Sequence, residues 1–102
     1  EGEVVDFMDV FGTGDHACVK ISDDSFEKDG IESGDFVVVR KQETCRDGDS
    51  VLALVNGRDA VIRRYFTDAN GGRLEPLTSS RKAVYSSNVT VIGVVVGVVR
   101  KF

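Results

Sequence analysis

The stretch ISDDSFEKDGIESGDFVVVR, residues 21–40, carries a serine on a polar segment, then two glycine turns and a strand. Ser25 lies five residues before Gly30, and Gly34 comes shortly before the apolar run 36–39. Glycine adopts positive φ without steric cost, so we expect a sharp backbone reversal at each of these glycines. Nucleophilic serines are often presented on such turns. A serine followed by acidic residues is also typical of a helix N-cap, and the spacing alone favours that interpretation.

The composition indicates one small domain that is rich in β-structure. At 102 residues the chain is long enough for a single hydrophobic core, so we expect one domain over residues 1–102. Valine is the commonest apolar residue, and eleven glycines accompany a single proline, which favours strands joined by tight turns. The net charge of −4 argues against direct binding of a nucleic-acid backbone, which needs a basic surface. Any contact with DNA is therefore expected to come from another domain.

The sequence offers little for a membrane span, a metal site or a disulfide framework. Its longest apolar stretch, residues 91–99, is interrupted by two glycines and is typical of a buried strand. Cys18 and Cys45 are too few for a disulfide framework, and His16 has no partner at metal-ligand spacing. We therefore expect reduced thiols, with a redox pair as the alternative, and neither a metal nor a cofactor. Because the chain does not begin with methionine, we expect a fragment of a longer protein, without a signal peptide.

A β-hairpin is the clearest local prediction. Residues 50–55 and 59–66 are two apolar-rich segments that flank Asn56 and Gly57. Asn-Gly is the preferred dipeptide of a type I′ turn, whose twist matches that of paired strands. The sequence therefore predicts two antiparallel strands joined at this turn.

The other elements follow from alternation and turn residues. In residues 16–21, Ala17, Val19 and Ile21 are expected on one face of a strand. The near-continuous apolar run at the end of the chain predicts a strand covered on both faces. The fold class that results is a compact, mostly antiparallel β-sheet or partly open barrel, with at most one short helical turn, near Ser25. We expect strands at 4–11, 16–21, 36–40, 50–55, 59–66, 73–76 and 88–101, and turns or polar loops at 12–15, 41–49, 68–72 and 78–82.

Taken together, these segments resemble the C-terminal domain of the LexA-type repressors. This self-cleaving serine peptidase family, with a signal-peptidase-like fold, is shared with UmuD-like proteins and many phage repressors. The resemblance covers essentially the whole chain in the right order. The matching segments are 19–22 before Asp24-Ser25, Gly30-Ile31, Gly34-Asp35, Asp47-Gly48-Asp49, the hairpin segments 51–55 and 60–65, Arg73-Leu74 with Pro76, and the ending 92–101.

The resemblance implies a serine nucleophile, activated by a neutral lysine, that attacks a peptide bond upstream in the same chain. Ser25 falls on the serine position, and the backbone amides of Asp24 and Ser25 are the candidate oxyanion donors. Arg63 falls on the lysine position. A desolvated lysine loses its proton readily enough to act as a base, whereas a guanidinium stays protonated and has no lone pair to accept a proton. Self-cleavage is therefore expected to be lost or impaired.

Two further departures from the family pattern lie beside Ser25. Asp23 occupies a position where the family usually has glycine, and Phe26 replaces a methionine while remaining a large apolar side chain. A charged arginine on an apolar strand face is costly unless it is paired. Our hypothesis is that Asp23, or failing it Asp24, forms an ion pair with Arg63. The alternative is that Arg63 reaches solvent along its aliphatic stem. The family's cleavable segment is expected upstream of the first residue.

The function that the resemblance implies is that of the C-terminal dimerisation and regulatory domain of a LexA-like transcriptional repressor in the SOS response. Such a protein is a cytoplasmic homodimer, bacterial or phage-encoded, that binds operator DNA through an N-terminal domain and responds to a RecA-type filament. The alternatives are an active self-cleaving peptidase, a UmuD-like polymerase accessory subunit and, with a poorer fit, a signal-peptidase relative. The strand expected to pair across the two-fold axis carries Val94, Val95, Val96, Val98 and Val99.

Overall fold

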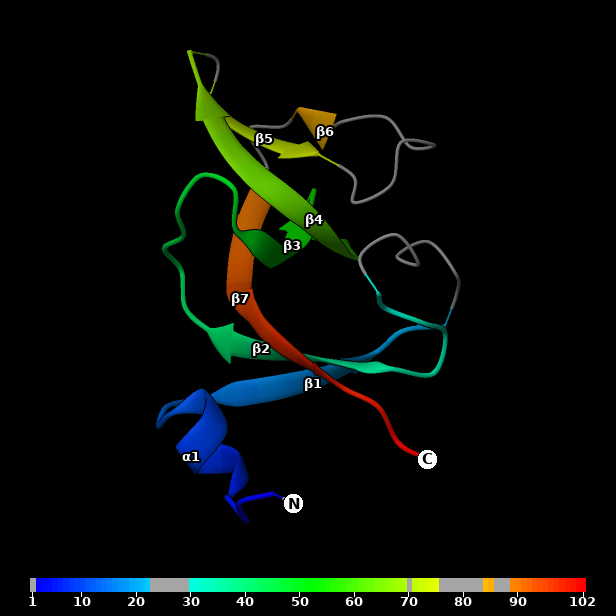
Figure 1. Ribbon diagram of the computed structural model, residues 1–102. Helices are drawn as coiled ribbons and strands as arrows, with labels where there is room; N and C mark the ends of the chain where they lie inside the picture. Colours follow the sequence, from blue (N-terminus) through cyan, green and yellow to red (C-terminus); the bar gives the residue numbers. More distant parts are fainter. Residues whose placement is uncertain (1, 23–29, 70, 76–83, 86–88) are drawn as a thin grey trace.

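The computed structural model describes residues 2–22, 30–69, 71–75, 84–85 and 89–102. In this part of the chain, one short helix precedes seven strands that form a single antiparallel sheet in the order β1-β2-β7-β3-β4-β5-β6 (Figure 1). The sheet is open, with β1 and β6 at its two ends, and the predicted fold class is confirmed. The strands are β1 (His16–Lys20), β2 (Phe36–Lys41), β3 (Ser50–Val55), β4 (Asp59–Asp68), β5 (Gly71–Glu75), β6 (Val84–Tyr85) and β7 (Val89–Val99).

The strand predicted for residues 4–11 is wrong, because this segment contains the helix α1 (Phe7–Phe11). The Asp6 amide donates to the Asp9 carboxylate at 3.1 Å, which satisfies a backbone group at the start of the helix. Phe7 and Phe11 lie one turn apart on the same side of the helix, with ring centroids 4.7 Å apart. The apolar residues of this segment thus follow a helical spacing instead of the alternation of a strand.

The predicted hairpin is confirmed. Asn56 and Gly57 both have positive φ, +55° and +66°, as a type I′ turn requires. Strand pairing begins at Val55 and Asp59, which are the predicted inner ends of the two strands, so that three residues connect β3 and β4. This register places Arg63 opposite Val51. A register one residue shorter would have moved every side chain of β4 to the other face.

β7 is an interior strand between β2 and β3, and it is bent at two irregularities. Its C-terminal half pairs with β2 and its N-terminal half pairs with β3 (Figure 1). The register shifts between Val38 and Val39 on one side and between Leu52 and Ala53 on the other, and such bulges bend a strand. Gly93 lies where β7 meets both neighbours, and a Cβ there would collide with the Arg40 carbonyl.

The prediction that the final strand is covered on both faces is wrong. Gly93 is the one fully buried residue of β7, and most of the others are half-buried. At the C-terminal end, Val98 and Val99 are each 40% exposed. β7 is paired with a neighbouring strand on both edges along part of its length. Its two faces are nevertheless only partly covered.

Two apolar clusters occupy opposite faces of the β3–β4 hairpin, because neighbouring residues of a strand point to opposite sides. Leu52 and Ile62 belong to the first cluster, while Val51 and Leu74 belong to the second. The first cluster is completed by residues from β2 and from the two segments that flank residues 23–29, and its buried members are Ile21, Ile31, Val37, Val39, Leu52 and Ile62.

The remaining predictions are confirmed in part. Ala17, Val19 and Ile21 are more buried than the intervening Cys18 and Lys20, as the alternation in residues 16–21 predicts. The segment expected at the edge of the sheet, residues 73–76, lies within β5 as far as Glu75, and β5 pairs with both β4 and β6. The loop expected at 78–82 lies outside the described residues.

Candidate functional site

Ser25, Asp24 and Asp23, predicted as the nucleophile, an oxyanion donor and the ion-pair partner of Arg63, lie outside the described part of the chain, as does Phe26. The nucleophile position, the oxyanion donors and the ion pair with Arg63 therefore stay predictions. Their flanking turns are described. Gly30 has φ of +77° and Gly34 has φ of +94°, so the two glycine reversals predicted from the sequence are confirmed.

The two ends of residues 23–29 are held beside each other by backbone hydrogen bonds. The Ile21 amide donates to the Asp35 carbonyl at 2.8 Å, and the Gly34 amide donates to the Ile21 carbonyl at 2.7 Å. Ile21 and Ile31, one on each side of the segment, are both buried in the first apolar cluster together with Ile62. The chain thus leaves and re-enters the core at neighbouring points on either side of residues 23–29.

Arg63 lies on β4, next in sequence to Ile62 but on the other face of the strand. Its Cα is paired with that of Val51, a fully buried residue of the second cluster, and its own side chain is half-buried. The Nη1 atom donates a hydrogen bond to the Ile62 carbonyl at 2.8 Å. A permanently charged group is therefore present on β4 at the position where the family resemblance calls for a neutral lysine.

The loop before β3 fixes the position of β4 near Arg63. The Gly48 amide donates to the Tyr65 carbonyl at 2.8 Å, and the Tyr65 amide donates to the Asp49 carbonyl at 2.9 Å. Asp47 Oδ1 accepts from the amide and the hydroxyl of Thr67 at 2.9 and 3.0 Å. These bonds give the Asp47-Gly48-Asp49 segment a structural role, because they hold the strand that carries the lysine position.

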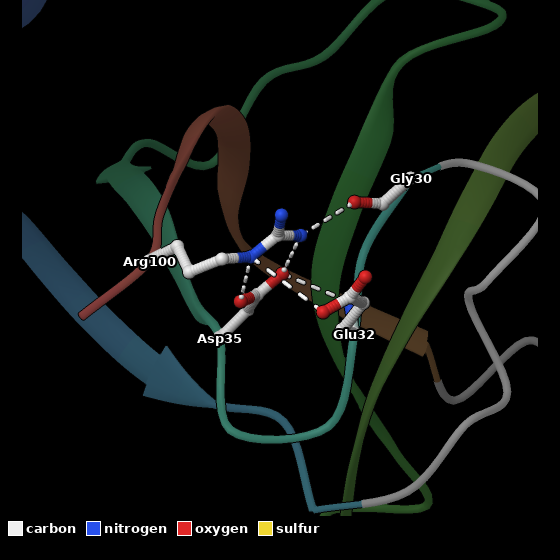
Figure 2. Close-up of polar contacts among 4 residues, drawn as sticks. All are labelled: Gly30, Glu32, Asp35 and Arg100. Carbon is white, nitrogen blue, oxygen red and sulfur yellow. Dashed lines mark hydrogen bonds and ion pairs between the residues drawn. The ribbon is translucent and has the colours of Figure 1, made fainter. Parts of the chain in front are cut away.

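Asp35 and Arg100 form a site that the sequence analysis missed (Figure 2). Arg100 Nε donates to Asp35 Oδ1 at 2.8 Å, and Arg100 Nη2 donates to Asp35 Oδ2 at 2.9 Å. The same Nη2 donates to the Gly30 carbonyl at 3.1 Å, and Glu32 Oε2 lies 3.8 Å from Nε. Asp35 Oδ2 also accepts from the Glu32 amide at 2.8 Å. An aspartate directly after a turn glycine was the available signal for this backbone bond, but nothing local indicated Arg100.

The electrostatics of this site favour the charged forms of both partners. The hydrogen bond from Arg100 and the backbone bond from Glu32 lower the pKa of Asp35 from 3.8 to about 2, and they outweigh the opposing effect of burial. The carboxylate in turn raises the pKa of Arg100 above its ordinary value. The pair is therefore fully ionised at neutral pH, and its bidentate geometry fixes the orientation of the guanidinium.

The strand expected to mediate dimerisation has an available edge. β7 pairs with β2 over Gly93–Val99, while its pairing with β3 ends at Val94. Among the described residues, the second edge of β7 from Val95 to Val99 has no strand partner. Exposed apolar side chains lie at this end of the strand and on α1, whose Phe11 is close to Gly97: they are Phe7, Met8, Val10, Val98, Val99 and Phe102.

The cysteines are free and differ in their surroundings. Cys18 is exposed, whereas Cys45 is half-buried against the second apolar cluster. Burial raises the pKa of the Cys45 thiol, and the nearby Asp49 and Asp47 raise it further. A thiol with a raised pKa is a poor nucleophile at neutral pH. Within the described ranges, no three acidic, histidine or cysteine residues gather where they would hold a metal ion, and no helix is suited to cross a membrane.

Comparison with known proteins identifies the family. The model of the Peptidase S24-like family matches residues 3–96, so this chain belongs to that family. A LexA repressor of Erythrobacter litoralis is 37% identical over 95 residues, which are 91% of this chain and 41% of that protein. LexA repressors of Bacillus cytotoxicus and Bacillus mycoides are each 39% identical over 82 residues, or 80% of this chain and 40% of theirs.

These similarities confirm the resemblance to the LexA-type C-terminal domain over most of the chain. The chain spans about two fifths of the length of the curated relatives that it matches. The open antiparallel sheet is consistent with the family's fold.

Proposed function

We propose that this chain is the dimerisation and regulatory domain of a LexA-like repressor in which self-cleavage is lost or strongly impaired. The observation that carries the proposal is Arg63. It lies half-buried on β4 at the lysine position of the family resemblance, and a guanidinium has no lone pair with which to accept the serine proton. Such a protein retains the serine position while lacking the base that would activate it.

Dimerisation is the second part of the proposal. The second edge of Val95–Val99, unpaired among the described residues, leaves backbone donors and acceptors for a neighbouring strand, and Val98 and Val99 add exposed apolar surface beside it. An antiparallel strand pair across a two-fold axis satisfies both at once. Two DNA-binding domains joined in this way match a palindromic operator. The net charge of −4 argues against direct binding of DNA by this domain.

The relatives favour a repressor over a polymerase accessory subunit, since they carry the name LexA repressor. In the proposed protein, an N-terminal domain binds the operator, the dimer is cytoplasmic, and a RecA-type filament is a candidate partner. Asp23, or failing it Asp24, accepts the Arg63 guanidinium, so that a structural ion pair occupies the former catalytic site.

The test is incubation of the full-length protein at pH 7 to 10, with fragments followed by gel electrophoresis and mass spectrometry. The wild type is expected to stay intact. Arg63→Lys is expected to gain self-cleavage that accelerates as pH rises, because the lysine loses its proton. General-base catalysis contributes about 10²- to 10⁴-fold to rate, so the gain should be large.

Arg63→Gln and the double variant Arg63→Lys with Ser25→Ala are the matched controls, and neither should cleave. Fragments from the wild type that disappear in Ser25→Ala would contradict the proposal. So would an Arg63→Lys variant that folds, dimerises and never cleaves.

A further inference from the structure

Asp35 is a buried acid that is bonded to the chain on both sides of residues 23–29. Its side chain is 3% exposed, and it is the one buried charged residue in the described part of the chain. The carboxylate binds the Glu32 amide, while the backbone carbonyl of Asp35 accepts from the Ile21 amide. A single residue thus holds the chain on both sides of the segment that contains Ser25.

Arg100 connects this arrangement to the end of β7. It follows Val99, the last residue of that strand, and its guanidinium reaches the Asp35 carboxylate and the Gly30 carbonyl (Figure 2). The Gly30 carbonyl is the first backbone acceptor after residues 23–29, and Gly30 has a positive φ. Arg100 is itself 42% exposed, so the pair has one buried partner and one at the surface.

The arrangement suits arginine in particular. The planar guanidinium donates two parallel bonds to the carboxylate and has a further N–H for the carbonyl, whereas the ammonium of a lysine is a point charge without this fork. The Asp35 carboxylate is desolvated, so removing Arg100 leaves a buried charge that has lost its main partner. Removing Arg100 should first weaken the hydrogen bonds of the Gly30 carbonyl and the Glu32 amide, because these are the other groups bonded to the pair.

We infer that Asp35 and Arg100 are a positioning pair that fixes the base of residues 23–29 to the C-terminal end of β7. We call it the Asp35–Arg100 clasp. It acts by holding the turn at residues 30–34 in place. We therefore expect the position of Ser25 to depend on whether Arg100, at the end of β7, keeps its bonds to Asp35 and Gly30. β7 is also the strand that we propose to pair in the dimer. This last consequence rests on the proposed function, whereas the clasp itself does not.

The first test is amide hydrogen exchange of this chain by NMR, in the wild type, Arg100→Gln, Arg100→Lys and Lys101→Gln. Lys101→Gln removes the same charge from the next, exposed residue and is the matched control. In Arg100→Gln the amides of Glu32 and Gly34 should exchange about tenfold faster or more, since a hydrogen-bonded charged group loses its partner. The amides of β3 and β4 should be unchanged. Arg100→Lys should recover only part of the protection.

Equal acceleration throughout the sheet would overturn the inference, because it would mean that Arg100 supports global stability alone. Unchanged exchange at Glu32 and Gly34 would also overturn it. Asp35→Asn provides a second variant, since the amide oxygen still accepts from Glu32 while the ion pair is lost. In the wild type, relative protection of Glu32 should decline as the pH falls from 4 towards 2, and in Asp35→Asn this decline should be absent.

The second test uses full-length protein that carries Arg63→Lys. Adding Arg100→Gln should lower the maximal self-cleavage rate about tenfold or more while leaving the midpoint of its pH profile unchanged. A shifted midpoint would overturn the inference, since Arg100 would then act on the proton of the base. If Arg63→Lys alone does not cleave, the proposed function fails, and the exchange measurement still decides whether the clasp exists.

Discussion

At the scale of single residues, an arginine at position 63 places a group that stays charged where the family resemblance calls for a lysine that can become neutral. Lysine and arginine are both cations in solution, but only lysine can be deprotonated by burial at workable pH. β4 is held near this position by the bonds of Tyr65 and Thr67 to the loop before β3, so the substitution acts on a well-positioned strand. We therefore attribute the proposed loss of self-cleavage to the missing lone pair, and not to a distorted scaffold.

Asp35 gives a pH prediction. Its pKa is 3.8 ordinarily and about 2 in the folded protein, so between these values the unfolded chain binds more protons than the folded one. The stability that this group contributes is fully present above about pH 4 and is lost as the pH falls towards 2. In urea titrations between pH 2 and 7, Asp35→Asn should lower the unfolding midpoint at neutral pH and flatten its dependence on pH at the acid end. A variant whose midpoint falls in parallel with the wild type across this range would contradict the assignment.

At the scale of elements, α1 depends on docking. An isolated helix of five residues is not stable in water, so α1 needs its tertiary contacts. Arg40 Nη2 donates to the Phe11 carbonyl at 2.7 Å, and the Phe11 ring lies against the position where a Cβ of Gly97 would be. The Phe7 ring meets His16 edge-on, with centroids 5.6 Å apart. The helix thus packs on β7 through the Phe11 ring, which lies beside Gly97.

Two glycines of β7 give contrasting predictions. A Cβ at Gly97 would collide with the Phe11 ring, so Gly97→Ala should displace α1 and cost about 1–3 kcal/mol. A Cβ at Gly93 would collide with the Arg40 carbonyl, a backbone atom that cannot move aside, so Gly93→Ala should cost more and destabilise the whole sheet. Chemical denaturation combined with exchange at residues 7–11 measures both effects. If Gly97→Ala costs as much in a Phe11→Ala background as alone, the collision with Phe11 is not its cause.

At the scale of the whole molecule, the described part of the open sheet has an unpaired edge along β7 from Val95 to Val99, in addition to its end strands β1 and β6. Other antiparallel sheets protect their edges with charges or short strands, whereas the edge at Val95–Val99 is apolar, as is suitable for pairing. The clasp starts one residue beyond this edge, so a partner strand would bear on the same end of β7 that holds the base of residues 23–29.

This arrangement predicts the effect of one charge on assembly. Val98→Asp should convert a dimer of this chain into a monomer in sedimentation equilibrium, because a two-fold axis brings the two new carboxylates together in an apolar contact. Ala60→Asp adds the same charge to an exposed position of β4 and should leave the dimer intact. Dissociation by Ala60→Asp together with persistence of the dimer in Val98→Asp would place the interface elsewhere.

The sequence by itself determined what depends on neighbouring residues. The positive φ at Gly30, Gly34, Asn56 and Gly57 follows from turn chemistry, and the positions of most strands follow from alternation. The family resemblance alone shows that Arg63 stands at the position of the general-base lysine, where an arginine cannot act as the base. The helix at α1 was missed because a few apolar residues fit both a strand and one helical turn, and a local pattern of that length does not decide between them.

Only the tertiary structure decided the features that join distant segments. Asp35 and Arg100 are 65 positions apart, and no local spacing pairs them. The pairing of Arg63 with Val51, which sets the face of Arg63, depends on how β3 and β4 are aligned, since the turn dipeptide itself is compatible with more than one register. The available edge of Val95–Val99 exists because β7 passes from one neighbour to another, which is a property of the whole sheet.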